Sequence, residues 1–241
     1  MRCWPAVLLC SALAAPAGAG PPFVTDDPEP TEYRGFEVYF FAEATHADGA
    51  TQGALPGIEI NYGPLPDVQL SFRLARDFEK TSGGPWQSRY GGAALSAKYR
   101  FLHEDEDGWR PQLGFFPSVE VPSGGDPVRK FLPLWAQKSF GAWTTFGGGG
   151  YWINPGDGNR NYWFTGWAVL REITDHLRLG GEIFHQTADT DGAFGSITGA
   201  GVAALYDFSD HWHVVGSANR GLGRAHSVNE ISGFIALELT M

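Results

Sequence analysis

Apolar and polar residues alternate along most of this chain, in runs of about ten residues separated by turn residues. The clearest run, VQLSFRLA at 68–75, places Val, Leu, Phe and Leu on one face and Gln, Ser, Arg and Ala on the other. A period of two residues predicts a β-strand, because successive side chains of a strand point to opposite faces. The same alternation returns at 58–62, 93–101, 112–121 and 235–241, which predicts an all-β protein.

The complete pattern predicts twelve strands. We place them at residues 35–46, 56–63, 67–77, 88–102, 109–121, 130–140, 142–153, 160–173, 176–187, 195–207, 211–221 and 230–241. Several strands carry ionisable residues on the face opposite the aliphatic residues. An even number of strands brings both chain ends to the same side, as in single-chain bacterial barrels.

The connections between these strands alternate in length. The long ones are predicted at 47–57, 77–87, 122–127, 154–161, 187–195 and 221–229. The others are mostly tight, as at 63–66, 141, 174–175 and 208–210. Short turns at one end and long loops at the other are typical of outer-membrane proteins. We therefore predict a transmembrane antiparallel up-and-down β-barrel over 35–241, with the short turns and both termini in the periplasm.

Aromatic residues gather near the predicted strand ends, which is typical of the aromatic girdles of membrane barrels. On the short-turn side they are Tyr62, Phe101, Trp109, Phe140, Trp143, Tyr206, Phe208 and Trp212. On the long-loop side they are Trp86, Tyr90, Trp152, Tyr162 and Trp163.

The first residues predict a secretory signal peptide over 1–19. Arg2 precedes a short apolar run, and small residues at 17–19 provide a cleavage site after Ala19. Both cysteines, Cys3 and Cys10, would leave with this segment, which excludes disulfides and thiolate metal sites from the mature chain. The proline-rich, acidic residues 20–34 are predicted to form an extended periplasmic arm.

Charge narrows the function classes. The net charge is −10, and loss of Arg2 with the signal peptide would make it −11. Nucleic acid is therefore not an expected partner, since binding to phosphates needs a basic face. No stretch approaches the ~20 apolar residues of a transmembrane helix.

Four segments carry a resemblance to a known family: PPFVTDDPEP, IEINYG, AKYRF and GGGGYWINPGDGN. Together they resemble the outer-membrane barrel family labelled with the meta-pathway of phenol degradation, over nearly the whole mature chain. The resemblance implies a barrel with a transport role linked to aromatic-compound degradation. It implies no catalytic or binding residues.

Strand alternation assigns ten charged residues to the lumen. These lumen-lining candidates are Glu37, Glu43, Glu59, Arg73, Lys98, Arg100, Glu120, Arg178, Glu182 and Glu238. A lumen of mixed sign predicts either a polar channel or a plug of ion pairs. Phe41, Phe116 and Phe184 fall on the same side and would suit an apolar or aromatic solute.

One alternative function is lipid hydrolysis, because His185 and Thr187 have the spacing of a base and a nucleophile on one strand. Thr replaces the usual Ser, and no residue can be named that would orient the imidazole. Gly147–Gly150 predicts a bend, a close approach of a neighbour or a lateral opening in its strand. A barrel that transports nothing and binds a partner through its loops is the third alternative.

The favoured prediction is a channel in the outer membrane of a Gram-negative cell for small solutes, with aromatic or hydrophobic compounds as candidates. Its expected partners are outer-membrane lipid, the barrel-assembly machinery and the solute. We expect no catalytic residues, no metal site and no cofactor.

Overall fold

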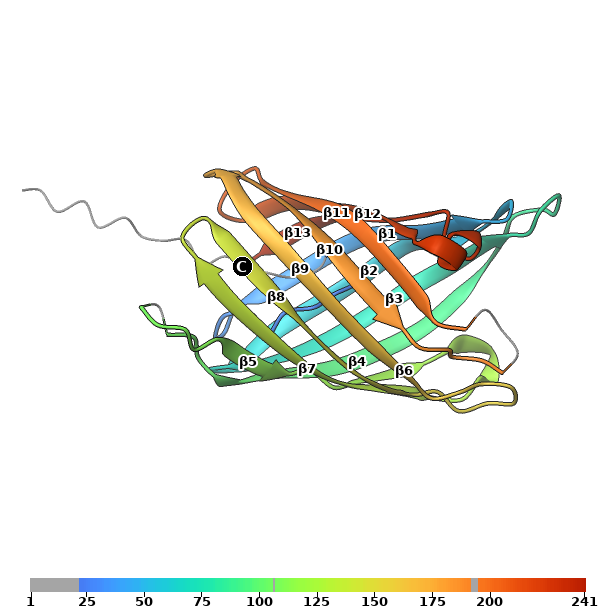
Figure 1. Ribbon diagram of the computed structural model, residues 1–241, viewed down its shortest axis with the longest axis horizontal. Helices are drawn as coiled ribbons and strands as arrows, with labels where there is room; N and C mark the ends of the chain where they lie inside the picture. The colour runs from blue at the N-terminus through green and yellow to red at the C-terminus, as the bar shows by residue number, and fades with distance from the viewer. Residues whose placement is uncertain (1–21, 106, 192–194) are drawn as a thin grey trace, which may run out of the picture.

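The computed structural model describes residues 22–105, 107–191 and 195–241, which form a closed antiparallel β-barrel (Figure 1). The signal peptide predicted at 1–19 lies outside the described residues. The strands are β1 (Phe36–Ala47), β2 (Ala50–Leu65), β3 (Val68–Lys80), β4 (Gln87–Leu102), β5 (Gln112–Phe115), β6 (Ser118–Val121), β7 (Arg129–Phe140), β8 (Trp143–Ile153), β9 (Tyr162–Thr174), β10 (Leu177–Gln186), β11 (Ile197–Asp207), β12 (Trp212–Gly221) and β13 (Ile231–Thr240).

The twelve-stranded fold predicted from the alternation is confirmed. β5 and β6 are two parts of one strand, because both pair with β4 and with β7 on either side of Phe116 and Pro117. β1 closes the barrel by pairing with β13 over ten residue pairs, from Glu37↔Thr240 to His46↔Ile231. Closure leaves no unpaired sheet edge in the described barrel, which is what hydrocarbon requires of a strand-built protein.

The outer surface is apolar along the strands. Exposed side chains include Leu70, Leu95 and Ile235, each from the predicted apolar face of its strand, and also Ile183 and Val202. The described helices are two short 3₁₀ turns, η1 (Ser123–Gly125) and η2 (Gly223–Ser227). None of the described helices is long and apolar enough to cross a membrane.

The two ends of the barrel differ in their connections. The short-turn end, which also holds Met241, carries the turns at 66–67, 141–142, 175–176 and 208–211, and it lies on the left in Figure 1. The long-loop end carries 81–86, 122–128, 154–161, 187–196 and 222–230.

Two connections depart from the predicted asymmetry. The long loop predicted at 47–57 is wrong, because β1 and β2 continue to a two-residue hairpin at Asp48-Gly49. Both residues have positive φ, 52° and 71°, the backbone that an Asp-Gly hairpin turn adopts readily. At the short-turn end, 103–111 is a long connection, so the strand predicted from 109 begins only at Gln112.

Two residues predicted for the outer aromatic girdle face the interior instead. Trp152 lines the barrel cavity, and Tyr162 is only 6% exposed and stacks on Trp152 at 5.8 Å. Strand alternation explains this placement, because their neighbours Tyr151 and Trp163 occupy the outward positions and contact each other at 5.0 Å. Proximity to a turn placed these residues near the strand ends correctly, but it did not predict whether their side chains point outward or into the lumen.

Candidate functional site

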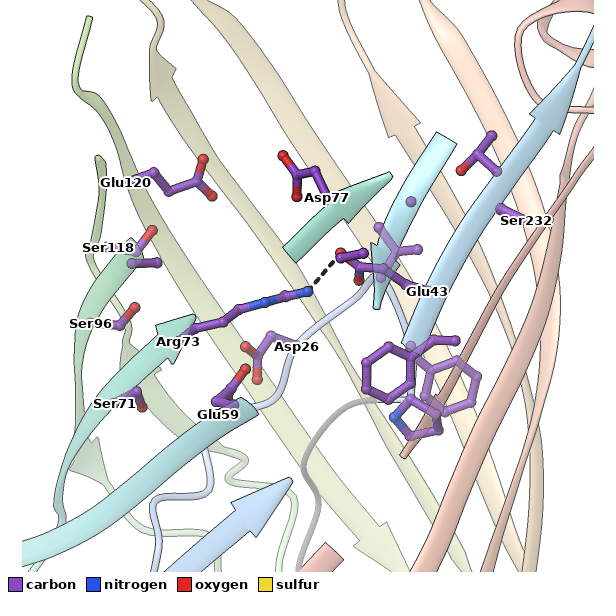
Figure 2. Close-up of a pocket in the computed structure, with 18 of the residues that line it drawn as sticks. Asp26, Glu43, Glu59, Ser71, Arg73, Asp77, Ser96, Ser118, Glu120 and Ser232 are labelled. Carbon is purple, nitrogen blue, oxygen red and sulfur yellow. Dashed lines mark ion pairs between the residues drawn. The ribbon is translucent and has the colours of Figure 1, made fainter. Parts of the chain in front are cut away.

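The barrel encloses a cavity of about 880 Å³. Figure 2 shows polar side chains from several strands pointing into it, among them Arg73, Glu59 and Glu120. The cavity reaches the long-loop end, because the lining residues Gln87, Ser88 and Arg89 are exposed there. Four residues of the N-terminal segment, Pro22, Phe23, Val24 and Asp26, also line it.

The segment predicted as an extended periplasmic arm does not extend away from the barrel. Residues 22–31 lie inside it, whereas Glu32, Tyr33 and Arg34 are exposed, and we call residues 22–32 the plug. Thr25 is 1% exposed and Asp27 is 2% exposed. The Lys98 ammonium, itself 3% exposed, holds the plug through Asp26 Oδ1 at 3.1 Å and Asp27 Oδ1 at 3.4 Å. The buried Asp27 and the half-buried Asp26 thus find their countercharge on β4.

Hydrogen bonds from other strands fix the plug backbone. The Glu182 carboxylate on β10 accepts the N–H groups of Val24 and Thr25, both at 3.0 Å. The Gln69 side-chain carbonyl on β3 accepts the N–H of Thr31 at 2.8 Å. Irregular backbone inside a barrel needs such partners, because no strand ladder satisfies its polar groups.

Glycines on the inward face make room for the plug. A Cβ at Gly166 would lie 2.1 Å from Thr25 Oγ1, and a Cβ at Gly114 would lie 2.8 Å from Pro28 Cβ. Any larger side chain at either position would therefore collide with the plug. The lumen wall is shaped around this segment.

A second group of ion pairs lies at the short-turn end. The Arg100 guanidinium donates to Glu29 and, at 2.7 Å, to Asp67 Oδ1 in the turn after β2. Burial acts to raise the pKa of Asp67, but the hydrogen bonds and charge of Arg100, with a smaller contribution from His103, outweigh it. The pKa of Asp67 is therefore lower than its ordinary value of 3.8.

One wall of the cavity, formed by β1 to β4, is polar and charged. The Arg73 guanidinium forms a salt bridge with Glu43 Oε1 at 2.7 Å, and it lies 4.2 Å from the ring centre of Phe41. Glu59 and Asp77 point into the same space (Figure 2). On β6 and β7, Glu120 pairs with Arg129.

The opposite wall, on β7 and β8, is aromatic. The rings of Phe131 and Trp152 stack with their centres 4.7 Å apart and their planes 10° from parallel. Trp135, 2% exposed, meets Phe131 edge to face at 6.4 Å, and Phe116 lines the cavity nearby. Sequence reasoning missed Phe131, Trp135 and Trp152 as lumen residues, although strict alternation along β7 from Arg129 would have placed the first two inward.

All ten predicted lumen candidates lie inside the barrel, in two groups. Those that line the cavity are Glu37, Glu43, Glu59, Arg73, Lys98 and Glu120. Two of the other four contact the plug: Glu182 accepts the N–H groups of Val24 and Thr25, and Arg100 pairs with Glu29. The remaining two contact other strands: Arg178 pairs with Asp207 at 3.2 Å, and Glu238 accepts the Tyr39 hydroxyl at 2.8 Å. Phe41 and Phe184 are buried, while Phe116 lies beneath the Lys98 ammonium at 4.7 Å.

His185 and Thr187 do not form a base and nucleophile pair. His185 Nδ1 hydrogen-bonds Thr198 Oγ1 at 2.8 Å, and Thr187 Oγ1 accepts the Trp163 N–H at 2.9 Å. Among the described residues no carboxylate contacts the His185 ring, so nothing orients it as a base. The described residues also include no cluster of three His, Cys, Asp or Glu that could hold a metal ion.

The fold is similar to solved outer-membrane channels. An outer-membrane channel from Pseudomonas putida F1 superposes with a TM-score of 0.68 at 13% identity, over 92% of this chain and all of that one. The NanC porin superposes with a TM-score of 0.61 at 8% identity, over 85% of this chain and 98% of that one. At these identities the likeness concerns the fold. No family model and no curated protein matches this chain, so the family label that the four sequence segments suggested is not confirmed.

Proposed function

We propose that this protein is an outer-membrane channel for small solutes, in which the plug closes the short-turn end of the lumen. The observation that carries the proposal is the cavity, which runs inside the closed barrel from the long-loop end down to the plug. The lumen charges therefore have two roles. Those toward the long-loop end line a polar path, and those toward the short-turn end hold the plug through ion pairs. A likeness of fold to two outer-membrane channels agrees with this role and with an outer-membrane location.

The solute is proposed to be small and partly apolar or aromatic. Phe131 and Trp152 offer flat apolar surface on one side, and charged groups such as Arg73 face them from the other. A cavity of about 880 Å³ is within the usual size of ligand sites, roughly 300–1,000 Å³.

Single-channel recording in planar bilayers tests the channel. We expect the full chain to conduct weakly or in brief openings, and a variant without residues 22–32 to conduct steadily. Heat-dependent mobility on a denaturing gel verifies that the deletion variant still forms a barrel. If both folded proteins are silent at all voltages, the channel proposal is wrong and a barrel that transports nothing takes its place.

Non-covalent contacts from Lys98, Glu182 and Gln69 hold the plug in the lumen. Its docking is therefore an equilibrium whose position these contacts determine. Passage of a solute through the short-turn end would require these contacts to break. The conducting state is therefore proposed to be the minor one in the resting protein.

A further inference from the structure

The charges that line the cavity do not balance. Seven acidic side chains face four basic ones: Asp26, Glu37, Glu43, Glu59, Asp77, Glu79 and Glu120 against Arg73, Arg89, Lys98 and Arg129. Three of the four bases are already neutralised at short range, Arg73 by Glu43, Lys98 by Asp26 and Arg129 by Glu120. The cavity as a whole therefore has a negative potential.

Four of the seven acids, Glu37, Glu59, Asp77 and Glu79, form no salt bridge with the described residues. Glu59 and Asp77 point into the cavity (Figure 2), and neither forms a salt bridge within 4.0 Å with any described residue. Both belong to the β1 to β4 wall, where Arg73 is held against Glu43 instead. This wall can accept one more positive group without displacing an existing pair.

Buried hydrogen-bond acceptors in the same lining also lack donors. The Asn61 side chain is 2% exposed and donates Nδ2 to Glu37 at 3.3 Å, but its Oδ1 has no partner among the described residues. The Asn219 side chain, 6% exposed, likewise has an Oδ1 without a partner in the part of the chain that the structure describes. Unsatisfied buried acceptors are uncommon in folded proteins. A donor that carries positive charge would suit the Asn61 carbonyl and the nearby Glu59 carboxylate together.

The aromatic wall offers surfaces that attract cations. Arg129 already lies 5.2 Å from the ring centre of Trp152, and Lys98 lies 4.7 Å from that of Phe116. The electron-rich faces of Trp and Phe attract ammonium groups and also pack well against an apolar or aromatic body.

We propose that the cavity binds protonated amines carried on a small aromatic or apolar body. This inference rests on the proposed function, because it assigns a class of solute to the cavity of that channel. The ammonium group lies toward Glu59 and Asn61, which are two residues apart on the inward face of β2, and the apolar body lies toward Phe131 and Trp152.

Calorimetric titration of the full, purified chain in detergent micelles tests the proposal, with 2-phenylethylammonium as the probe. Three matched compounds serve as comparisons: the neutral 2-phenylethanol, the anion 3-phenylpropionate, and phenyltrimethylammonium, which keeps the charge but has no N–H donor. We expect saturable binding of 2-phenylethylammonium at least about tenfold tighter than that of the alcohol, and little binding of the anion. The quaternary ion should bind more weakly than the amine, because it cannot donate a hydrogen bond to the Asn61 carbonyl.

Two variants locate the site. Glu59→Gln and Asn61→Leu should each weaken binding of the amine by about three- to tenfold and leave binding of the alcohol unchanged. Glu172→Gln, at an exposed position outside the cavity lining, is the matched control and should bind like the unaltered chain. Circular dichroism and gel mobility confirm that each variant folds.

Equal affinity for the amine and the anion, or amine binding that neither cavity variant changes, overturns the inference. The outcome is separable from that of the channel test. Conduction without preference for the amine rejects the amine site alone, whereas tight amine binding by a barrel that never conducts rejects the channel alone.

Discussion

Replacement of Lys98 by Met should release the plug. The Lys98 ammonium contacts Asp26, Asp27 and the Glu29 carbonyl oxygen, all within 3.4 Å, and it is 3% exposed. Methionine keeps most of the apolar stem but leaves Asp27, 2% exposed, without its countercharge. In the undocked state water solvates both aspartates, so the whole penalty falls on the docked state. Removal of one partner of a buried pair costs about 3–5 kcal/mol, which corresponds to a shift of roughly 150- to 5,000-fold in the docking equilibrium.

Cysteine accessibility measures this shift directly. Both native cysteines, Cys3 and Cys10, lie in the predicted signal peptide, so Thr25→Cys supplies a single thiol at a position that is 1% exposed. The rate at which a maleimide labels it reports the undocked fraction, and it should rise at least about a hundredfold in Lys98→Met. Lys80→Met, which removes an amine near Trp86 at the end of β3, is the matched control and should not change the rate. Equal labelling rates in the two variants would refute the assignment of Lys98 as the main anchor of the plug.

Three further predictions follow from particular contacts. Asp67→Asn should lower the stability of the barrel to denaturant by about 1.5–3 kcal/mol at pH 7. Because the folded pKa of Asp67 is depressed below 3.8, the difference should be complete at neutral pH and be lost as the pH falls through the folded pKa; a difference that stays constant as the solution is acidified would contradict this assignment. Gly166→Val should raise the labelling of Thr25→Cys, since its side chain would occupy the space of Thr25 Oγ1, and an unchanged rate would mean that the plug does not depend on this gap. Leu95→Arg, at a position 59% exposed on the outer face of β4, should destabilise the barrel in lipid vesicles by about 2–4 kcal/mol; no loss there would place Leu95 away from hydrocarbon.

The sequence predicted the barrel because its strands must alternate. In β3 Leu70 faces lipid while the next residue, Ser71, faces the lumen, so the alternation is visible in adjacent residues of the sequence. The ten inward charges follow from the same rule. The two-residue hairpin at Asp48-Gly49 was missed because weakly apolar residues follow it, so the pattern did not show that the ladder continues.

The plug could not be predicted from alternation. Its docking depends on pairs that are distant in the chain, such as Lys98 with Asp26, and on glycines such as Gly166 whose role appears only when the strands are assembled. A proline-rich acidic segment is equally compatible with an arm in solvent. The Lys98 ammonium inside the lumen pairs with Asp26 and Asp27 and so favours the docked plug over an arm in solvent.

In the proposed channel the cavity opens only at the long-loop end, on the outside of the cell, and labelling of single cysteines in intact cells measures this. Ser96→Cys places a thiol in the cavity lining, and Ser209→Cys places one in an exposed turn at the short-turn end. With a small, charged reagent that cannot cross lipid, we predict rapid labelling of Ser96→Cys in intact cells and labelling of Ser209→Cys only after the cells are broken. Rapid labelling of Ser209→Cys in intact cells, or protection of Ser96→Cys until the cells are broken, would contradict the account.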